Sequence, residues 1–292
     1  MDICKTFVIA ARWCYQWVRP KPEYYHKVNS VGVEKSNGSE PPLIISLTSF
    51  PARISTVRYT IESIFLQRKK ANRVILWLAE EQFPKKEKEL PKSLIRLCRF
   101  GLEIRWCHDI HSYKKLIPAL REFPEDIIVT IDDDIWYPPL WLENLYHSYK
   151  NKPNFVHADR ALKVKISNDS ICDYSSWEMH NYGPQKPSFR WHLTGCGGVL
   201  YPPHSLHPDV LKEDIFMNIA NKVDDIWFWS MAILQGTKIC IPDNNIFDFE
   251  GVFIVNNQSL WSENYFGRND EALIKIVEKY PIIKDRLIRD NW

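Results

Sequence analysis

From Leu43 onward, short apolar runs rich in β-branched residues alternate with segments in which apolar residues recur every three or four positions. The first pattern is typical of buried strands and the second of helices. The sequence predicts strands at 43–49, 73–79, 102–107 and 126–131, and helices at 54–67, 94–100, 117–123 and 140–149. This alternation favours an α/β fold in which a mostly parallel central sheet is flanked by helices. Ligands of such sheets bind beyond the carboxyl ends of the strands.

The first 42 residues precede this pattern and differ from it. The segment 7–18 is apolar, and a helix formed there would gather the long polar side chains on one narrow stripe. We expect an amphipathic helix that either packs against protein or lies in a membrane interface with its basic residues near the headgroups. Residues 20–42 contain four prolines, which predicts a linker between this helix and the rest of the chain.

The composition argues against several classes of protein. The formal net charge is only +2, which argues against the basic surface of a nucleic-acid binder. The seven cysteines are scattered with no CxxC pair, which disfavours a zinc knuckle and fits a reducing compartment. The sequence contains no run of about 18 apolar residues, so it predicts no membrane-spanning helix. We expect a cytoplasmic protein, with residues 1–19 as the place of any peripheral contact with the inner face of the cell membrane or with a partner helix.

The strongest chemical signal is the apolar strand 127–131, which runs directly into Asp132, Asp133 and Asp134. Carboxylates this close repel one another unless a cation or a proton neutralises them. Because alternate residues of a strand face the same side, we expect Asp132 and Asp134 to point together. Their oxygens suit Mg²⁺ or Mn²⁺, which keep coordination positions open for phosphate oxygens. The alternative is a solvated acidic turn, or an aspartate that caps the helix after Pro138.

Four motifs in this order resemble one family. The strand that ends in Asp-x-Asp is similar to the donor site of nucleotide-sugar-dependent glycosyltransferases with the GT-A fold. The segment 44–53 (IISLTSFPAR) resembles the first strand and nucleotide loop of bacterial capsule and O-antigen polysaccharide glycosyltransferases. The segment 197–203 (GGVLYPP) is similar to their acceptor-side glycine turn. The pair Asp224-Asp225 resembles their second acidic motif and, more distantly, an acidic pair of exostosin-like transferases.

The resemblance spans roughly residues 43–250 and implies a GT-A-like glycosyltransferase domain at 43–292. Its first half, 43–160, is expected to bind the nucleotide sugar, and 161–292 to bind the acceptor and form the C-terminal helices. The resemblance also implies a divalent metal, Mn²⁺ or Mg²⁺, held by Asp134 and Asp132. The chain departs from the family because it has no histidine near its C-terminus to serve as a third metal ligand.

Candidates for donor binding follow the carboxyl ends of the expected strands. Hydroxyl and backbone groups after the first strand suit a base or a ribose, and an arginine fork suits phosphate. A carboxylate after the third strand can accept from the base or ribose, and the lysine pair 114–115 can meet the diphosphate, unless these side chains are simply solvated. The donor-binding candidates are Thr48, Ser49, Arg53, Asp109, Lys114, Asp132, Asp133 and Arg160.

Asp224 and Asp225 open the helix expected at 225–234, where one of them can act as a cap. The other is the catalytic candidate. It would accept a proton from the acceptor hydroxyl in an inverting reaction, or orient the acceptor in a retaining one. Glycines allow close backbone approach to a ligand, and tryptophans either stack on sugar rings or fill the core. The acceptor-binding candidates are Trp177, Glu178, Gly197, Gly198 and Trp227.

These motifs predict a hexosyltransferase that moves a sugar from a nucleotide diphosphate, UDP above all, to a hydroxyl of a glycan or lipid-linked glycan in bacterial surface polysaccharide synthesis. One alternative is a sugar-phosphate nucleotidyltransferase, which would usually show a glycine-rich basic loop where this chain reads SFPAR at 49–53. The other is a catalytically inactive carbohydrate-binding protein. In that case the electrostatic repulsion among the clustered aspartates would have no functional explanation.

Overall fold

The structure is a computed structural model that describes residues 28, 30–36, 38–179, 185–246, 250–252 and 267–290. The amphipathic helix expected before residue 20 lies outside these ranges. Within the ranges, no helix has the length and apolar character needed to cross a bilayer.

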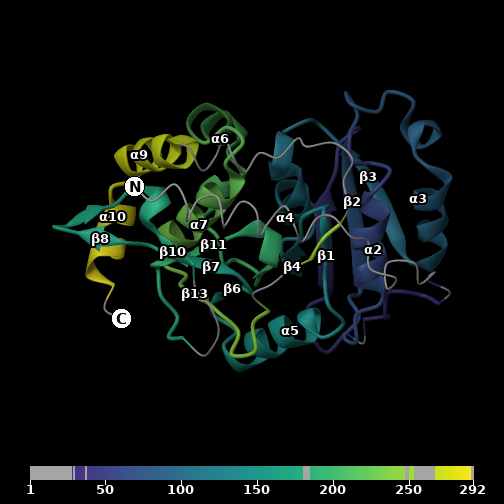
Figure 1. Cartoon of the computed structure of the whole chain (residues 1–292), viewed down its shortest axis with the longest axis horizontal. Helices are drawn as coiled ribbons and strands as arrows, with labels where there is room; N and C mark the ends of the chain where they lie inside the picture. Colours follow the sequence, from purple (N-terminus) through teal and green to yellow (C-terminus); the bar gives the residue numbers. More distant parts are fainter. Residues whose placement is uncertain are drawn as a thin grey trace, which may run out of the picture.

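A seven-stranded central sheet with the order β13-β6-β12-β4-β1-β2-β3 confirms the α/β fold (Figure 1). Neighbouring strands pair in parallel except at β12, which runs antiparallel to both β4 and β6. The inner strands are mostly apolar because both faces of the sheet are covered. The strands are β1 (Leu43–Thr48), β2 (Arg73–Ala79), β3 (Leu102–Cys107), β4 (Ile127–Thr130), β6 (Val156–Ala158), β12 (Val199–Tyr201) and β13 (Ile239–Cys240).

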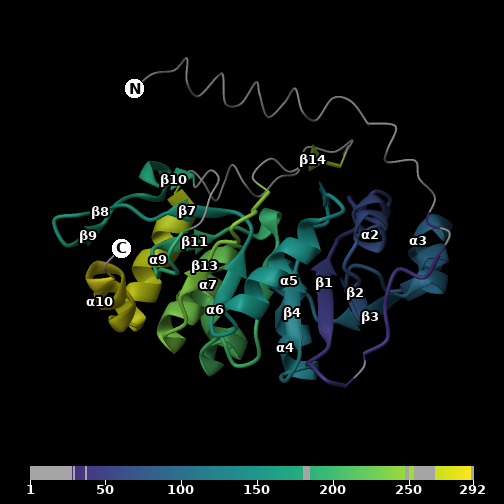
Figure 2. The ribbon, with the colours of Figure 1, turned by 90° about the horizontal axis from the view of Figure 1, so that it is seen from below.

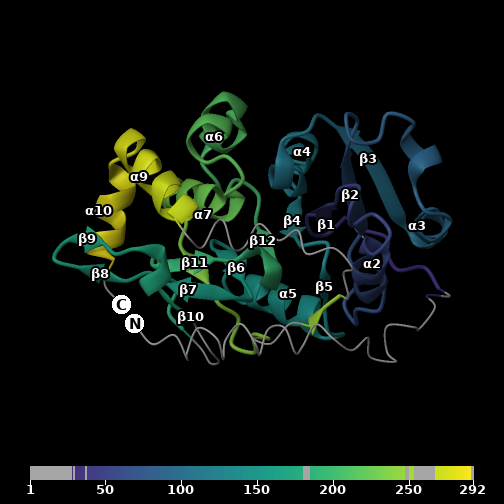
Figure 3. The same ribbon diagram turned by 45° about the horizontal axis from the view of Figure 1, so that its top comes forward.

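Helices cover both faces of this sheet (Figures 2 and 3). On one face, Ile45, Leu47 and Leu76 pack with α2 (Val57–Phe65), α3 (Lys92–Leu97) and α5 (Trp141–Asn151). On the other, Ile44 and Ile75 belong to a core shared with the remaining helices. Those helices are α4 (Ile117–Glu122), α6 (Glu213–Ile219), α7 (Asp224–Gln235), α9 (Asn269–Lys279) and α10 (Ile282–Arg289). Alternate residues of each strand thus supply two separate cores.

Smaller sheets, which the sequence did not predict, lie around the second half of the chain. Their strands have two or three residues each, too few to show an alternating pattern. β7 (Ala161–Lys163), β10 (Glu178–Met179) and β11 (Trp191–Leu193) form an antiparallel sheet, β5 (Ile135–Trp136) pairs with β14 (Glu250–Gly251), and β8 (Ile166–Ser167) pairs with β9 (Ser170–Ile171). The 3₁₀ turns are η2 (Lys86–Glu89), η3 (Cys98–Phe100), η4 (His111–Lys115), η5 (Tyr174–Ser176), η6 (Gly195–Gly197) and η7 (Pro208–Leu211).

A buried histidine belongs to the β7-β10-β11 sheet. The ring of His192 on β11 meets the edges or faces of Tyr174, Trp177 and Trp229 at centroid distances of 5.5, 5.4 and 5.2 Å. Neither ring nitrogen has a hydrogen-bond partner among the described residues. Burial lowers the pKa of His192 to about 3, so the imidazole stays neutral in the folded chain. An imidazole that leaves water without new partners costs stability.

Replacing His192 by phenylalanine is therefore expected to stabilise the fold by about 1 kcal/mol or more at pH 7. The unfolded chain takes up a proton on this histidine near pH 6.5, whereas the folded chain does so only near pH 3. The penalty of the native histidine thus grows as the pH falls through this window, and the gain in the variant grows with it. Thermal unfolding at pH 7 and pH 5 measures both. The exposed His147→Phe variant is the control, and a gain in His192→Phe that does not exceed the control's would contradict the expectation.

Candidate functional site

The three aspartates that follow β4 lie at the carboxyl end of the central sheet. β4 ends at Thr130, and Asp133 and Asp134 form part of the turn beyond it. Strand alternation therefore does not reach these side chains, because the strand has already ended, and the expectation that Asp132 and Asp134 point together stays a prediction. The turn instead brings two adjacent aspartates to one guanidinium: Arg53 Nη1 lies 2.8 Å from Asp133 Oδ1 and 2.9 Å from Asp134 Oδ2.

Asp133 anchors the loop after β1 to this turn. Its Oδ2 accepts a hydrogen bond from Ser49 Oγ at 2.6 Å, and its backbone carbonyl accepts one from Thr60 Oγ1 at 3.0 Å. The side chain is buried. The side chains of Ser49 and Asp133 therefore satisfy each other, and their predicted contacts with a donor stay predictions. Thr48 at the end of β1 donates from Oγ1 to the Trp77 carbonyl at 2.8 Å.

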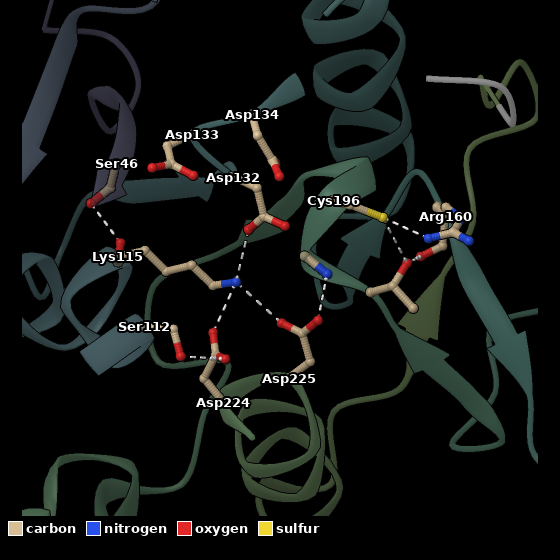
Figure 4. A network of polar contacts seen from close by, with 12 residues as sticks. Ser46, Ser112, Lys115, Asp132, Asp133, Asp134, Arg160, Cys196, Asp224 and Asp225 are labelled. Carbon is tan, nitrogen blue, oxygen red and sulfur yellow. Dashed lines mark hydrogen bonds and ion pairs between the residues drawn. The ribbon is translucent and has the colours of Figure 1, made fainter. Parts of the chain in front are cut away.

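A buried lysine lies at the centre of the site (Figure 4). Lys115 Nζ is 3.1 Å from Asp132 Oδ1, 2.8 Å from Asp224 Oδ2 and 3.2 Å from Asp225 Oδ1. Lys115 ends η4, and its carbonyl accepts a hydrogen bond from Ser46 Oγ of β1 at 2.7 Å. One ammonium thus links the aspartates after β4 to the acidic pair that opens α7.

The sequence favoured the neighbouring lysine instead. Lys114 is buried and forms an ion pair with Asp109. Asp109 also accepts hydrogen bonds from Gln82 Nε2 at 2.7 Å and from the His111 N–H at 3.0 Å. Lys114 and Asp109 therefore pair with each other, and their donor contacts remain predictions.

The two aspartates of α7 differ in how far they are available to a ligand. Ser112 Oγ donates to Asp224 Oδ1 at 2.7 Å, and the Asp224 side chain is only 10% exposed. Asp225 accepts from the Gly195 N–H at 2.7 Å, yet its side chain is 32% exposed. Both lie in the first turn of the helix, where the dipole favours a carboxylate. Asp225 is therefore the more accessible of the two, and its catalytic role stays a prediction.

Charge is unevenly balanced in this cluster. Five carboxylates (Asp132, Asp133, Asp134, Asp224 and Asp225) surround two cations, Arg53 and Lys115, so three negative charges are uncompensated when all are ionised. Desolvation raises the pKa of Asp134 to about 7, against the opposing effect of Arg53. Desolvation also raises the pKa of Asp225 to about 6, against the effect of Lys115. Burial alone would lower the pKa of Lys115, but its three carboxylates outweigh burial and raise it well above the ordinary value.

The glycine turn packs directly against this cluster. A Cβ on Gly195 would lie 2.4 Å from Lys115 Nζ and 2.9 Å from Asp225 Oδ1, so only glycine fits without displacing them. A Cβ on Gly197 would lie 2.5 Å from the Arg160 Cβ. Gly198 has a φ of +81°, and a Cβ there would lie 2.2 Å from the buried Trp141 ring. Gly197 and Gly198 thus have packing reasons to be glycine, and their contact with an acceptor stays a prediction.

The remaining candidates are spread around the turn. Trp227 is fully buried, and its indole donates to the Val210 carbonyl, so the prediction that it contacts an acceptor is wrong. Trp177 is 7% exposed and belongs to the same core, whereas Glu178 on β10 is exposed. Arg160 Nη1 lies 2.6 Å from the Cys196 sulfur. It stays a prediction that Trp177 and Glu178 contact the acceptor and that Arg160 contacts the donor.

Tyr137 joins the aspartate turn to the glycine turn, a role the sequence did not reveal. Its hydroxyl donates to the Cys196 carbonyl at 3.1 Å and accepts from the Asp132 N–H at 3.2 Å. The ring is buried against Trp141. No local pattern marks this tyrosine, because both partners come from loops that only the tertiary fold brings together.

Solved structures that share this fold include two complexes with nucleotide sugars. A mannosyltransferase from Pyrobaculum calidifontis, in complex with GDP-mannose and Mn²⁺, matches with a TM-score of 0.50 and 12% identity over 96% of this chain and 76% of that chain. TarS from S. aureus, in complex with UDP-GlcNAc, matches with a TM-score of 0.51 and 11% identity over 81% of this chain and 66% of that chain. No protein-family model and no curated protein matches the sequence. At this identity the likeness shows the fold alone, which is GT-A-like as the motifs predicted.

Proposed function

We propose that this chain is a metal-dependent glycosyltransferase. It transfers a hexose-like sugar from UDP to a hydroxyl of a glycan or lipid-linked glycan, in the assembly of bacterial surface polysaccharide. Two neighbours in fold bind a nucleotide sugar, GDP-mannose in one and UDP-GlcNAc in the other, which supports the donor class. The resemblance of its motifs to capsule and O-antigen enzymes supports the pathway.

One observation carries the proposal. Asp132 and Asp225, whose side chains are 31% and 32% exposed, face each other across the Lys115 ammonium at the carboxyl end of the sheet. Open α/β sheets bind their ligands at that edge. The first aspartate belongs to the proposed donor motif and the second to the proposed acceptor motif. A sugar bound between them would have a leaving diphosphate on one side and an acceptor hydroxyl on the other.

The carboxylates suit a divalent metal. Mg²⁺ and Mn²⁺ prefer hard oxygen ligands and are commonly held by one or two carboxylates together with waters and substrate phosphates. When all five carboxylates are ionised, their three uncompensated negative charges would repel a diphosphate unless a cation entered with it. Among the described residues no group of three His, Cys, Asp or Glu side chains is placed to hold a metal ion. Asp132 and Asp134 would hold the divalent ion, and it would neutralise the departing diphosphate.

The chain's own groups would do the rest. Arg53, near the end of β1, holds Asp134 and Asp133 in the turn beside the proposed phosphate position. Asp225, held by the Gly195 N–H and Lys115, would accept the proton of the acceptor hydroxyl if the anomeric centre inverts. If configuration is retained, the same carboxylate would orient that hydroxyl.

Calorimetry with UDP and Mn²⁺, followed by a hydrolysis assay, tests this proposal. The panel contains UDP-glucose, UDP-galactose, UDP-GlcNAc and GDP-mannose. We expect Mn²⁺-dependent nucleotide binding and slow release of sugar from one UDP donor, both abolished by a chelator. Absence of nucleotide binding, or hydrolysis that a chelator leaves unchanged, would contradict the proposal. A crystal with UDP and Mn²⁺ bound far from Asp132 and Asp134 would do the same.

A further inference from the structure

Lys115 makes an unusual set of contacts for a lysine. Its side chain is 6% exposed, and its ammonium lies within 3.2 Å of carboxylates on two different elements. Burying a charge costs free energy, so buried charges in proteins are generally paired and hydrogen-bonded. Asp132 comes from the turn after β4, and Asp224 and Asp225 come from α7. The lysine therefore joins two parts of the chain that lie about 90 residues apart in the sequence.

We propose that Lys115 is the built-in cation of this site. It is a positioning residue that fixes Asp132 and Asp225 against each other and keeps a divalent ion out of the space between them. This inference rests on the proposed function, in which the divalent ion is confined to the side of Asp132 that faces Asp134. No contact of Lys115 with substrate is invoked, because its three carboxylates already surround the ammonium.

The position of the ammonium is set by the backbone as well as by charge. Ser46 Oγ of β1 donates to the Lys115 carbonyl at 2.7 Å, and Trp77 Nε1 in turn donates to Ser46 Oγ at 3.0 Å. On the opposite side, the absence of a side chain at Gly195 leaves room for Nζ, since a Cβ there would lie 2.4 Å from it. The ammonium is therefore held in one place and is not a mobile counterion.

A fixed ammonium differs from a metal in what it does to these carboxylates. It donates hydrogen bonds to Asp132 Oδ1 at 3.1 Å and to Asp225 Oδ1 at 3.2 Å. Unlike a metal ion, it has no open coordination position for a phosphate oxygen. A divalent ion between the same carboxylates would coordinate Asp225 directly and remove it from the acceptor. With Lys115 in place, Asp225 is held but keeps a partly exposed carboxylate. The lysine thus separates the metal side of the cluster from the acceptor side.

The test compares Mn²⁺ binding, with the metal alone, in the native chain and in Lys115→Met, by calorimetry. Methionine has a similar length and no charge, so the three carboxylates lose their internal cation. We expect Lys115→Met to bind Mn²⁺ at least about tenfold more tightly, or to bind one additional ion. A lysine with a merely structural role predicts the opposite, because a disturbed site binds a metal more weakly. Equal or weaker Mn²⁺ affinity in Lys115→Met would overturn the inference.

Lys238→Met is the matched control. Lys238 Nζ pairs with the buried Asp290 at 2.7 Å, so this variant also removes a lysine from a buried carboxylate, but outside the cluster. Its Mn²⁺ affinity should equal that of the native chain. The comparison stands even if the native chain hydrolyses no nucleotide sugar. That result would contradict the proposed function alone, whereas the difference between Lys115→Met and the native chain decides the role of Lys115.

A second pair of variants covers the case in which Lys115→Met does not fold. Asp224→Asn removes one negative charge, and Asp224→Asn combined with Lys115→Met restores the native net charge without the lysine. The double variant should bind Mn²⁺ at least about tenfold more tightly than Asp224→Asn. Equal affinities in this pair would overturn the inference. In the native Asp224 background, donor hydrolysis by Lys115→Met should lose kcat more than it raises KM, because Asp225 keeps the Gly195 N–H but loses its second hydrogen-bond donor.

Discussion

Replacing Asp134 by alanine is expected to abolish nucleotide-sugar turnover, with kcat lower by about 10³-fold or more, and to leave the fold nearly intact. The proposed metal loses one of its two protein ligands, and several kcal/mol of charge stabilisation at the leaving diphosphate are lost with it. The fold should survive because Arg53 keeps its ion pair with Asp133 at 2.8 Å. Removing one carboxylate also relieves part of the excess negative charge. Hydrolysis of the active donor and thermal unfolding measure the two effects.

Glu103→Ala is the matched control for this variant. Glu103 on β3 pairs with Arg73 at 2.6 Å and with Arg105 at 2.9 Å, so it is also a carboxylate that bridges basic groups, but it lies outside the site. Its removal should leave turnover unchanged. Full activity in Asp134→Ala, or equal losses in both variants, would show that Asp134 does not hold the donor through a metal. A large drop in thermal stability of Asp134→Ala would instead assign it a structural role.

The sheet and the aspartate turn could be predicted because their signals are local. Strand β4 is four consecutive buried residues, three of them apolar, and the aspartates follow one residue after its end. The orientation of these aspartates could not be predicted. It depends on where the strand ends, at Thr130, and on Arg53, which reaches the turn from a loop about 80 residues earlier.

Choosing between adjacent residues was harder than finding the motif. Lys114 and Lys115 are chemically identical, and which of them faces the cluster is set by a hydrogen bond between the Lys115 carbonyl and Ser46 on another strand. Asp224 and Asp225 differ in accessibility for a similar reason, because Ser112 of η4 donates a hydrogen bond to Asp224 alone. These decisions rest on contacts between residues that are distant in sequence, and local patterns do not report them.

Trp227 is a case in which the sequence held a signal that was not used. The helix α7 reads DDIWFWSMAILQ, and beyond its two aspartates it is apolar on all sides. A helix that is apolar all round is typically buried, so core packing was the better prediction for its tryptophans. The structure agrees, with Trp227 and Trp229 both fully buried. The acidic N-terminus of this helix, and not its aromatic body, meets the site.

Replacing Asp225 by asparagine is expected to lower turnover by about 10²-fold or more and to change the dissociation constant of UDP with Mn²⁺ by less than about threefold. The amide has nearly the shape of the carboxylate but cannot take a proton from an acceptor. Gly195 N–H and Lys115 Nζ both donate to Asp225, and an amide can satisfy only one of them with its oxygen. The donor side should be spared, because Asp132 and Asp134 keep their charges. Calorimetry and the hydrolysis assay separate these two effects.

Asp209→Asn provides the comparison for that variant. Asp209 is likewise near the start of a helical turn and pairs with Lys212 at 2.9 Å, but it belongs to η7 and has no contact with the cluster. Its turnover should equal that of the native chain. If UDP affinity collapses in Asp225→Asn, the carboxylate belongs to the donor side and the proposed division of the site between Asp132 and Asp225 is wrong. If turnover is unchanged while UDP still binds, the proton acceptor lies elsewhere, because the amide of asparagine cannot accept the proton of the acceptor hydroxyl.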